Sequence, residues 1–262
     1  MRILLTNDDG IEAPGIRALY GAIESLGEVL PIAPRTPQSA AGHGITFDRP
    51  LMSEEVTVEG GMSGIAIHGR PADCVKVGLR TIWEERYGPG SRPDVTISGM
   101  NSGANVGVNI IYSGTVAAAI ESAFLGVPAI AVSLHLGAVS EVRYARAAQI
   151  AREVIDRVLA HPLDPHGVVN INVPRIERDD APTPPVRVVS MNPAPGVDTY
   201  ERRESPYGQV YYWSDGSGMD FTETMSGSDV EALNERFVTV TPLSYVMTDQ
   251  DRMETWRSRL EL

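Results

Sequence analysis

Short apolar runs alternate with amphipathic segments along much of this 262-residue chain. Residues 2–6 form an apolar run that ends in an Asn-Asp-Asp-Gly turn, which predicts a buried strand followed by a loop. Apolar residues then recur at helical spacing behind Pro14, and Gly27 stands where that helix would end. The chain therefore opens with a predicted strand, loop and helix.

The alternation continues downstream. Further strands are expected at 29–33, 45–48, 56–58, 65–68, 94–98, 129–134 and 168–173. Helices are expected from Pro71 to about Trp83, from Thr115 to Leu125 and over about 140–160. Strands that alternate with helices favour right-handed crossovers and a mostly parallel sheet. We therefore predict a Rossmann-like, three-layer α/β/α core over residues 1–180.

The pattern changes beyond about residue 180. Proline-rich turns are followed by a Tyr- and Trp-rich stretch at 200–213, a β-like segment at 237–243 and a charged terminal helix. We predict that 181–262 is a C-terminal extension, part β-rich and part helical, that forms an arm and returns to the core.

The charge balance narrows the range of partners. The chain has 22 Lys and Arg against 34 Asp and Glu, a formal net charge of −12, so its overall field repels polyanions. Duplex nucleic acid and anionic membranes are therefore disfavoured as main partners. A small anionic substrate would need local attraction from a bound cation or a helix N-terminus.

Cysteine usage and the absence of long apolar runs indicate the compartment. Cys74 is the single cysteine and cannot form an intramolecular disulfide. No apolar run has the length of a signal peptide or of a membrane span. We therefore expect a cytoplasmic protein.

Polar side chains with oxygen atoms follow three of the predicted strands: Asp8 and Asp9, then Gln38 and Ser39, then Asn101, Asn105, Ser113 and Thr115. The carboxyl ends of parallel strands share one edge of the sheet, where open α/β folds bind ligands. Carboxylate, hydroxyl and amide oxygens suit a hard divalent cation such as Mg²⁺ or Mn²⁺. The alternative is structural, with Asp9 capping the next helix and Asp8 facing water.

A second feature of the sequence favours binding of a phosphate group. Ser113-Gly114-Thr115 stands at the start of an Ala-rich helix, whose free N–H groups and dipole attract anions, although ordinary helix capping explains the same residues. His43 is a candidate substrate contact, against the alternative of a loop histidine with ordinary polar partners. Arg70 is a candidate for the vicinity of the anion, whereas Asp73 is expected at a helix N-terminus and Cys74 in the core.

Familiar nucleotide signatures are absent. The sequence contains no G-x-x-x-x-G-K-[ST] motif and no G-x-G-x-x-G after a strand, which excludes P-loop phosphoryl transfer and dinucleotide redox chemistry. It also lacks a G-x-S-x-G nucleophile elbow, and Gly10 stands where an aspartyl-phosphate phosphatase would have its second Asp.

The chain resembles the SurE family of stationary-phase survival proteins, metal-dependent nucleoside-monophosphate phosphatases, along nearly its whole length. The resemblance rests on linked motifs in a fixed order: ILLTNDDGIEAPG at 3–15, AP-x-x-x-QS at 33–39, PADCVK at 71–76, SGMN-x-G-x-N-x-G at 98–107, YSGTVAAA at 112–119 and VTVTPL at 238–243. Each motif is weak alone, but together they are specific.

The resemblance implies roles for individual residues. The metal ligands would be Asp8, Asp9, Ser39 and Asn101. The phosphate would face Asn105, Ser113, Gly114 and Thr115. It also implies homodimers or homotetramers that exchange C-terminal segments. The chain departs from the family pattern at Arg35, Ala40, Arg70 and Val108-Asn109, which bears on substrate preference and assembly.

These observations predict a phosphomonoesterase. We expect hydrolysis of nucleoside 5′- or 3′-monophosphates beside one divalent ion per subunit, with Asp8 accepting a proton from the attacking water. One alternative is a nucleotide or phosphate sensor without turnover. Others are an acid phosphatase or exopolyphosphatase, and an assembly protein whose aromatic arm is the functional part.

Overall fold

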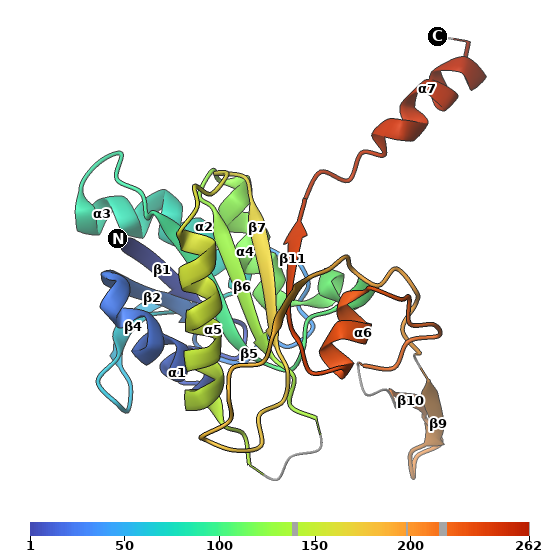
Figure 1. Ribbon diagram of the computed structural model, residues 1–262, viewed down its shortest axis with the longest axis horizontal. Helices are drawn as coiled ribbons and strands as arrows, with labels where there is room; N and C mark the ends of the chain where they lie inside the picture. The colour runs from blue at the N-terminus through green and yellow to red at the C-terminus, as the bar shows by residue number, and fades with distance from the viewer. Residues whose placement is uncertain (138–140, 198, 215–218, 262) are drawn as a thin grey trace.

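The computed structural model describes residues 1–137, 141–197, 199–214 and 219–261. Within these residues a nine-stranded sheet has the order β3-β4-β2-β1-β5-β6-β7-β11-β8 (Figure 1). Its strands are β1 (Arg2–Thr6), β2 (Glu28–Pro34), β3 (Ser53–Thr57), β4 (Ser63–Ile67), β5 (Val95–Ser102), β6 (Ala129–Leu134), β7 (Val168–Val173), β8 (Val186–Val188) and β11 (Val238–Leu243). All neighbours from β4 to β7 are parallel, while β3 and β11 run antiparallel to β4 and β7. The predicted mostly parallel α/β fold is confirmed.

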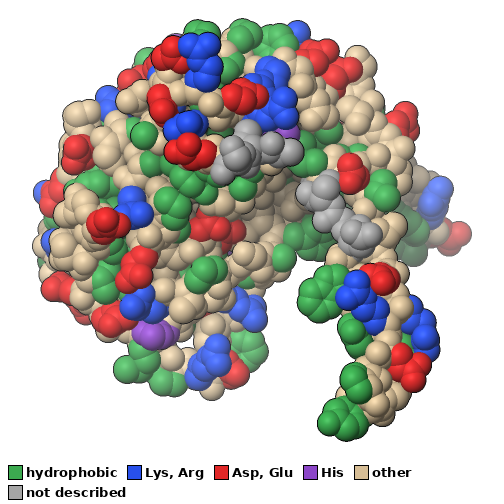
Figure 2. Space-filling model, turned by 90° about the horizontal axis from the view of Figure 1, so that it is seen from below, with side chains coloured by type: hydrophobic (Ala, Val, Ile, Leu, Met, Phe, Trp, Pro, Cys, Tyr) green, Lys and Arg blue, Asp and Glu red, His purple; other side chains and the backbone are tan. Residues whose placement is uncertain are grey.

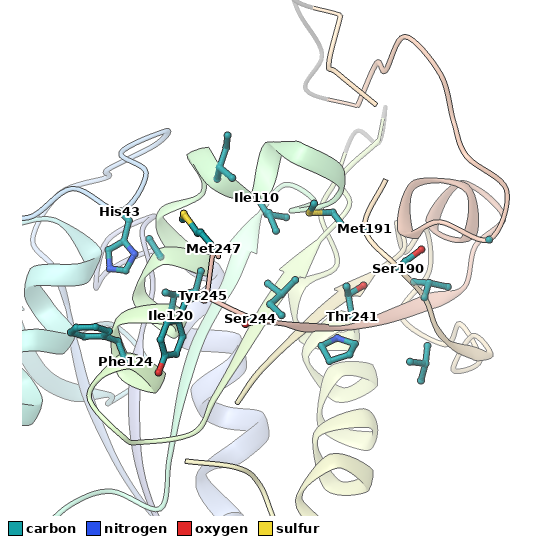
Figure 3. A pocket seen from close by; sticks show the side chains of 17 residues that line it. His43, Ile110, Ile120, Phe124, Ser190, Met191, Thr241, Ser244, Tyr245 and Met247 are labelled. Carbon is teal, nitrogen blue, oxygen red and sulfur yellow. The ribbon is translucent and has the colours of Figure 1, made fainter. Parts of the chain in front are cut away.

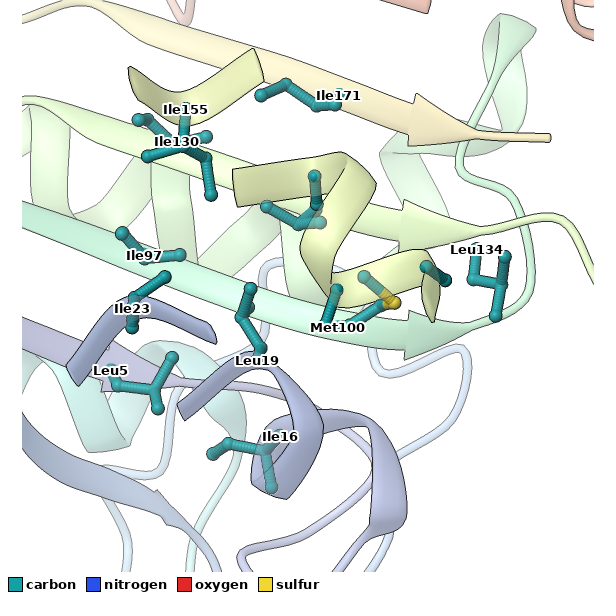
Figure 4. Close-up of a cluster of buried hydrophobic side chains, with 14 of the residues drawn as sticks. Leu5, Ile16, Leu19, Ile23, Ile97, Met100, Ile130, Leu134, Ile155 and Ile171 are labelled. Atoms are coloured by element: carbon teal, nitrogen blue, oxygen red, sulfur yellow. The ribbon is translucent and has the colours of Figure 1, made fainter. Parts of the chain in front are cut away.

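Helices cover both faces of the sheet. Helices α1 (Pro14–Ile23) and α5 (Tyr144–Leu159) pack against each other on one face, and α2 (Pro71–Val77) and α4 (Gly114–Phe124) do so on the other (Figure 1). Leu19 and Ile23 of α1 and Ile155 of α5 meet the apolar side chains of β5 and β6 between them (Figure 4). A second cluster surrounds the fully buried Trp83 on the opposite face. The sheet is therefore enclosed on both sides, as parallel sheets usually are.

Several local predictions differ from the structure. The predicted strand at 45–48 is a loop, because the Thr46 backbone N–H donates to Asp73 Oδ1 (2.8 Å) across the loop. The strand predicted at 56–58 is the edge strand β3, which starts at Ser53 and is largely exposed. The helix predicted to end near Trp83 changes to a π-helical segment, Gly78–Ile82, and continues as α3 (Trp83–Tyr87).

Pro31 lies in β2, which is inside the sheet, although proline in a sheet is usually confined to edge strands. The pairing of β2 with β4 begins only at Ile32, one residue beyond the proline. A Cβ at Gly64 would lie 2.7 Å from the Cβ of Pro31, so the missing side chain of Gly64 makes room for the ring. The pair explains how a residue without an N–H donor is accommodated there.

The C-terminal third both rejoins the body and projects from it. Strands β8 and β11 extend the main sheet, and α6 (Asp229–Asn234) packs through Val230 and Leu233 against Val106. The antiparallel hairpin of β9 (Tyr200–Glu204) and β10 (Val210–Ser214) stands clear of the body, as does α7 (Gln250–Arg259) (Figures 1 and 2). The division at residue 180 stays a prediction. No helix among the described residues is long and apolar enough to span a membrane.

Candidate functional site

The site lies at the carboxyl edge of the sheet, where β1 is flanked by β2 on one side and β5 on the other. The chain reverses its strand order at this point, which is where open α/β sheets form ligand crevices. A cavity of about 220 Å³ opens there. Its lining residues are Asp8, Asp9, Ser39, Ala40, Asn101, Ser102, Asn105, Asn109, Tyr112 and Ser113. The three predicted loops therefore converge.

Asp8 is held at the base of this cavity. Its side chain is only 6% exposed, which excludes the structural alternative in which Asp8 faces water. The Thr115 hydroxyl donates to its Oδ1, and its backbone carbonyl accepts from Gln38 N (2.8 Å). Burial raises the pKa of Asp8 to about 6; the neighbouring charge of Asp9 adds to this, and the bond from Thr115 opposes it.

Asp9 and Asn101 are oriented by backbone groups of the β5 end. Asp9 Oδ2 accepts from Ser102 N (2.9 Å), so this carboxylate bridges the first and third loops. It does not cap α1, whose N-cap is Ala13 without a side-chain bond. The Asn101 Nδ2 donates to the Gly103 carbonyl (2.8 Å), which leaves the amide oxygen as the acceptor for the cavity.

The donor set fits a divalent cation. The residues described here include no group of three or more His, Cys, Asp or Glu arranged for a metal. The cavity instead combines two adjacent carboxylates with the hydroxyl of Ser39 and the amide oxygen of Asn101. Two carboxylates in a partly buried cavity repel unless a positive charge lies between them. Hard oxygen ligands are those that Mg²⁺ and Mn²⁺ prefer.

The start of α4 borders the same cavity. Ser113 caps the helix by accepting from Val116 N (3.1 Å), and it also lines the cavity. Gly114 has a different use, because a Cβ there would lie 2.8 Å from Asp8 Cβ and 2.9 Å from Pro71 Cγ. Thr115 is fully buried and turned toward Asp8. The structure thus brings Ser113 to the cavity, while Gly114 and Thr115 support Asp8.

Asn105 is fixed by three residues that sequence reasoning missed. The Asn172 side chain accepts from Asn105 N (2.8 Å) and donates to its carbonyl (2.9 Å), and Asn170 donates to that same carbonyl (2.9 Å). The Asn105 amide donates to Ser133 Oγ (2.8 Å). The detectable signal was two asparagines at alternate positions of the apolar run VVNINV.

Replacing Asn172 with Ala should lower the free energy of unfolding by about 1–3 kcal/mol, because the Asn105 peptide loses its buried partner. Urea unfolding measures the change. Asn234→Ala, at an exposed position of α6, is the matched control and should change stability by less than about 0.5 kcal/mol. Equal stability of the two variants would contradict the structural role of the Asn172 side chain.

His43 lies away from this cavity. It lines a larger, mostly apolar pocket of about 1010 Å³, together with Ile110, Ile120 and Phe124 (Figure 3). Its Nε2 is 2.8 Å from Glu121 Oε2, and Lys76 Nζ is 3.1 Å from the other oxygen. Burial favours the neutral form of Glu121, but these two partners outweigh it and hold the Glu121 pKa below its ordinary value.

Other residues that the sequence singled out have clear places. Asp73 accepts from Arg70 N (2.9 Å) at the start of α2, as expected, and Cys74 is buried. Arg70 does not line the acidic cavity. Ala40 lines it with a φ of 53°, a conformation that glycine adopts more readily. Asn109 and Tyr112 are further lining residues that were not anticipated.

Both the sequence and the fold of this chain resemble those of known proteins. The family model described as "Survival protein SurE" matches residues 3–192. A protein of Rhodopirellula baltica named "5'-nucleotidase SurE" is 41% identical, with 99% of this chain and 100% of the relative covered. One of the same name from Carboxydothermus hydrogenoformans is 37% identical over 100% and 98% of the two chains. The crystal structure of a SurE protein from Aquifex aeolicus superposes with a TM-score of 0.82 at 32% identity, and both chains are fully covered.

Proposed function

This chain belongs to the Survival protein SurE family, and we propose on that basis that it hydrolyses nucleoside 5′- or 3′-monophosphates to nucleoside and phosphate. The observation that carries the proposal is the meeting of Asp8, Asp9, Ser39 and Asn101 in one cavity beside the start of α4. No other described cavity combines two carboxylates with a helix N-terminus.

One divalent cation per chain, Mg²⁺ or Mn²⁺, would be held by the Asp8 and Asp9 carboxylates, the Ser39 hydroxyl and the Asn101 amide oxygen. When bound, it would neutralise phosphoryl oxygens and make a water molecule more acidic. Asp8, whose Oδ1 is anchored by Thr115, accepts the proton of the attacking water. Asn105 and Ser113 donate hydrogen bonds to the phosphoryl oxygens as their charge redistributes.

Phosphate release from a panel of nucleoside monophosphates tests this proposal. We expect turnover with Mg²⁺ or Mn²⁺ and loss of turnover with EDTA, restored by adding metal. The panel includes p-nitrophenyl phosphate and tripolyphosphate, to separate a nucleotidase from a general phosphatase or exopolyphosphatase. Nucleotide-dependent thermal stabilisation without any phosphate release would favour a sensor instead.

We also propose that the chain assembles into homodimers or homotetramers through its C-terminal arm and works in the cytoplasm. Large apolar side chains are exposed on the hairpin and on α7, including Tyr212, Trp213 and Trp256. Groups of exposed apolar side chains commonly mark surfaces that contact another protein chain. Light scattering should give two or four times the 28.3 kDa chain mass, and a monomer would contradict the proposal.

A further inference from the structure

A second polar cavity has a volume of about 500 Å³. It is lined by Thr36, Gln38, Thr46, Arg49, Pro50, Met52, His68, Gly69 and Arg70. Its polar side chains are hydrogen-bond donors, and no Asp or Glu is among the lining residues. The acidic cavity differs in charge, because the carboxylates of Asp8 and Asp9 line it and no Arg, Lys or His does.

The rim of this second cavity is built around a buried carboxylate. Asp73, 1% exposed, accepts from Thr46 N (2.8 Å), from Thr46 Oγ1 (2.7 Å) and from Arg70 N (2.9 Å). It therefore ties the loop before β3 to the start of α2. The Arg70 guanidinium lies against Gly44, where any Cβ would collide with it. The position of Arg70 is thus set by both segments.

The two arginines of the cavity have no acidic partner. Within the described residues neither Arg49 nor Arg70 forms an ion pair, whereas nearby Arg35 pairs with Glu12 and Glu54. The chain carries a net charge of −12, so two uncompensated guanidinium groups in one cavity make a local positive site in a negative field. Arginine is well suited to phosphate because its planar fork can donate two hydrogen bonds at once.

Two consecutive residues line the two cavities. Gln38 lines the second cavity and the next residue, Ser39, lines the acidic one. The same segment is anchored by the bond from Gln38 N to the Asp8 carbonyl (2.8 Å). Consecutive Cα atoms are about 3.8 Å apart, so a substrate whose reacting phosphate occupies the acidic cavity can extend a second anionic group past Gln38.

We propose that Arg49 and Arg70 form a subsite for a second phosphate group of the substrate, as in nucleoside 3′,5′-bisphosphates. The inference rests on the proposed function for the identity of the reacting group. The reaction is unchanged: water attacks the phosphorus in the acidic cavity, the ester P–O bond breaks, and phosphate and an alcohol leave. The second phosphate stays intact and supplies binding energy.

The test compares adenosine 3′,5′-bisphosphate with adenosine 5′-monophosphate in the full-length protein with Mg²⁺. The double variant Arg49→Gln/Arg70→Gln should lose at least about tenfold more kcat/KM on the bisphosphate than on the monophosphate, mainly through KM. Arg80→Gln, at an exposed position outside both cavities, is the matched control and should leave both substrates unaffected. A tripolyphosphate arm shows whether a linear phosphate chain uses the same subsite.

Calorimetric binding keeps the subsite separate from turnover. In the Asp8→Asn background, adenosine 3′,5′-bisphosphate should bind about tenfold more weakly once both arginines are replaced. If this loss of binding is found but the unsubstituted protein releases no phosphate from any nucleotide, the proposed function fails and the subsite stands. Equal losses on both nucleotides would overturn the subsite, since the arginines would then act only by general attraction or by stacking on the base.

Discussion

Phosphate release should fall by at least about 10²-fold when Asp8 is replaced by Asn, while the protein stays folded. The change keeps the shape of the side chain and its acceptor for the Thr115 hydroxyl, but it removes one carboxylate from the cation site and the proton acceptor. It also removes a buried charge beside Asp9, so the metal-free variant should be at least as stable as the parent.

Steady-state phosphate release and urea unfolding measure the two effects separately. Asp180→Asn is the matched control, because it makes the same chemical change in an exposed ion pair with Arg178 and should alter neither quantity appreciably. Full turnover of Asp8→Asn with the nucleotide panel would remove the mechanism. A variant that fails to fold would contradict the expected stability.

Gly114→Ala should damage both stability and turnover. The added Cβ would stand 2.8 Å from Asp8 Cβ and 3.0 Å from Asp8 Oδ2, so either the carboxylate or the start of α4 must move. Overpacking of this kind costs about 1–3 kcal/mol. A displacement of about 1 Å at a reacting group can cost on the order of 10²-fold in rate.

Gly21→Ala makes the same substitution where nothing lies within 4 Å of the new Cβ, at an exposed position in the last turn of α1. It should raise the free energy of unfolding by about 0.5–1 kcal/mol and leave turnover unchanged, because alanine is the better helix former. Comparing the two variants therefore separates the steric effect of a Cβ at position 114 from the general effect of replacing glycine with alanine in a helix. Identical behaviour of the two variants would refute the steric role of Gly114.

Much of the core could be predicted from local pattern. The apolar runs that became β1, β6 and β7 are bounded by turn residues, and burial on both faces of a parallel sheet requires such runs. Because parallel strands end at one edge, the convergence of Asp8, Ser39 and Asn101 also followed from the strand predictions alone. The edge strand β3 was placed less well, since its exposed positions carry little apolar signal.

The hydrogen-bond partners of the site's side chains could not be predicted from strand positions. Asn105 and Asn172 are 67 residues apart, and their pairing depends on how β5, β6 and β7 are ordered and on which face each side chain takes. Thr115 was assigned to the phosphate from its place at a helix start. Its hydroxyl donates to Asp8, because the start of α4 packs against the loop that follows β1. The pairing of His43 with Glu121 on α4 likewise depends on a contact between segments that are distant in the sequence.

Residue types and their order along the chain were enough to specify an α/β sheet with oxygen-bearing loops at one edge, because hydrophobic periodicity and chain direction are local properties. Packing then divided those polar residues between two cavities of opposite charge, with Ser39 lining the acidic cavity and Gln38 the other. Side-chain direction and close approach depend on contacts between distant segments. For that reason the separation of acids from arginines became visible only once the helices and loops were seen against the sheet.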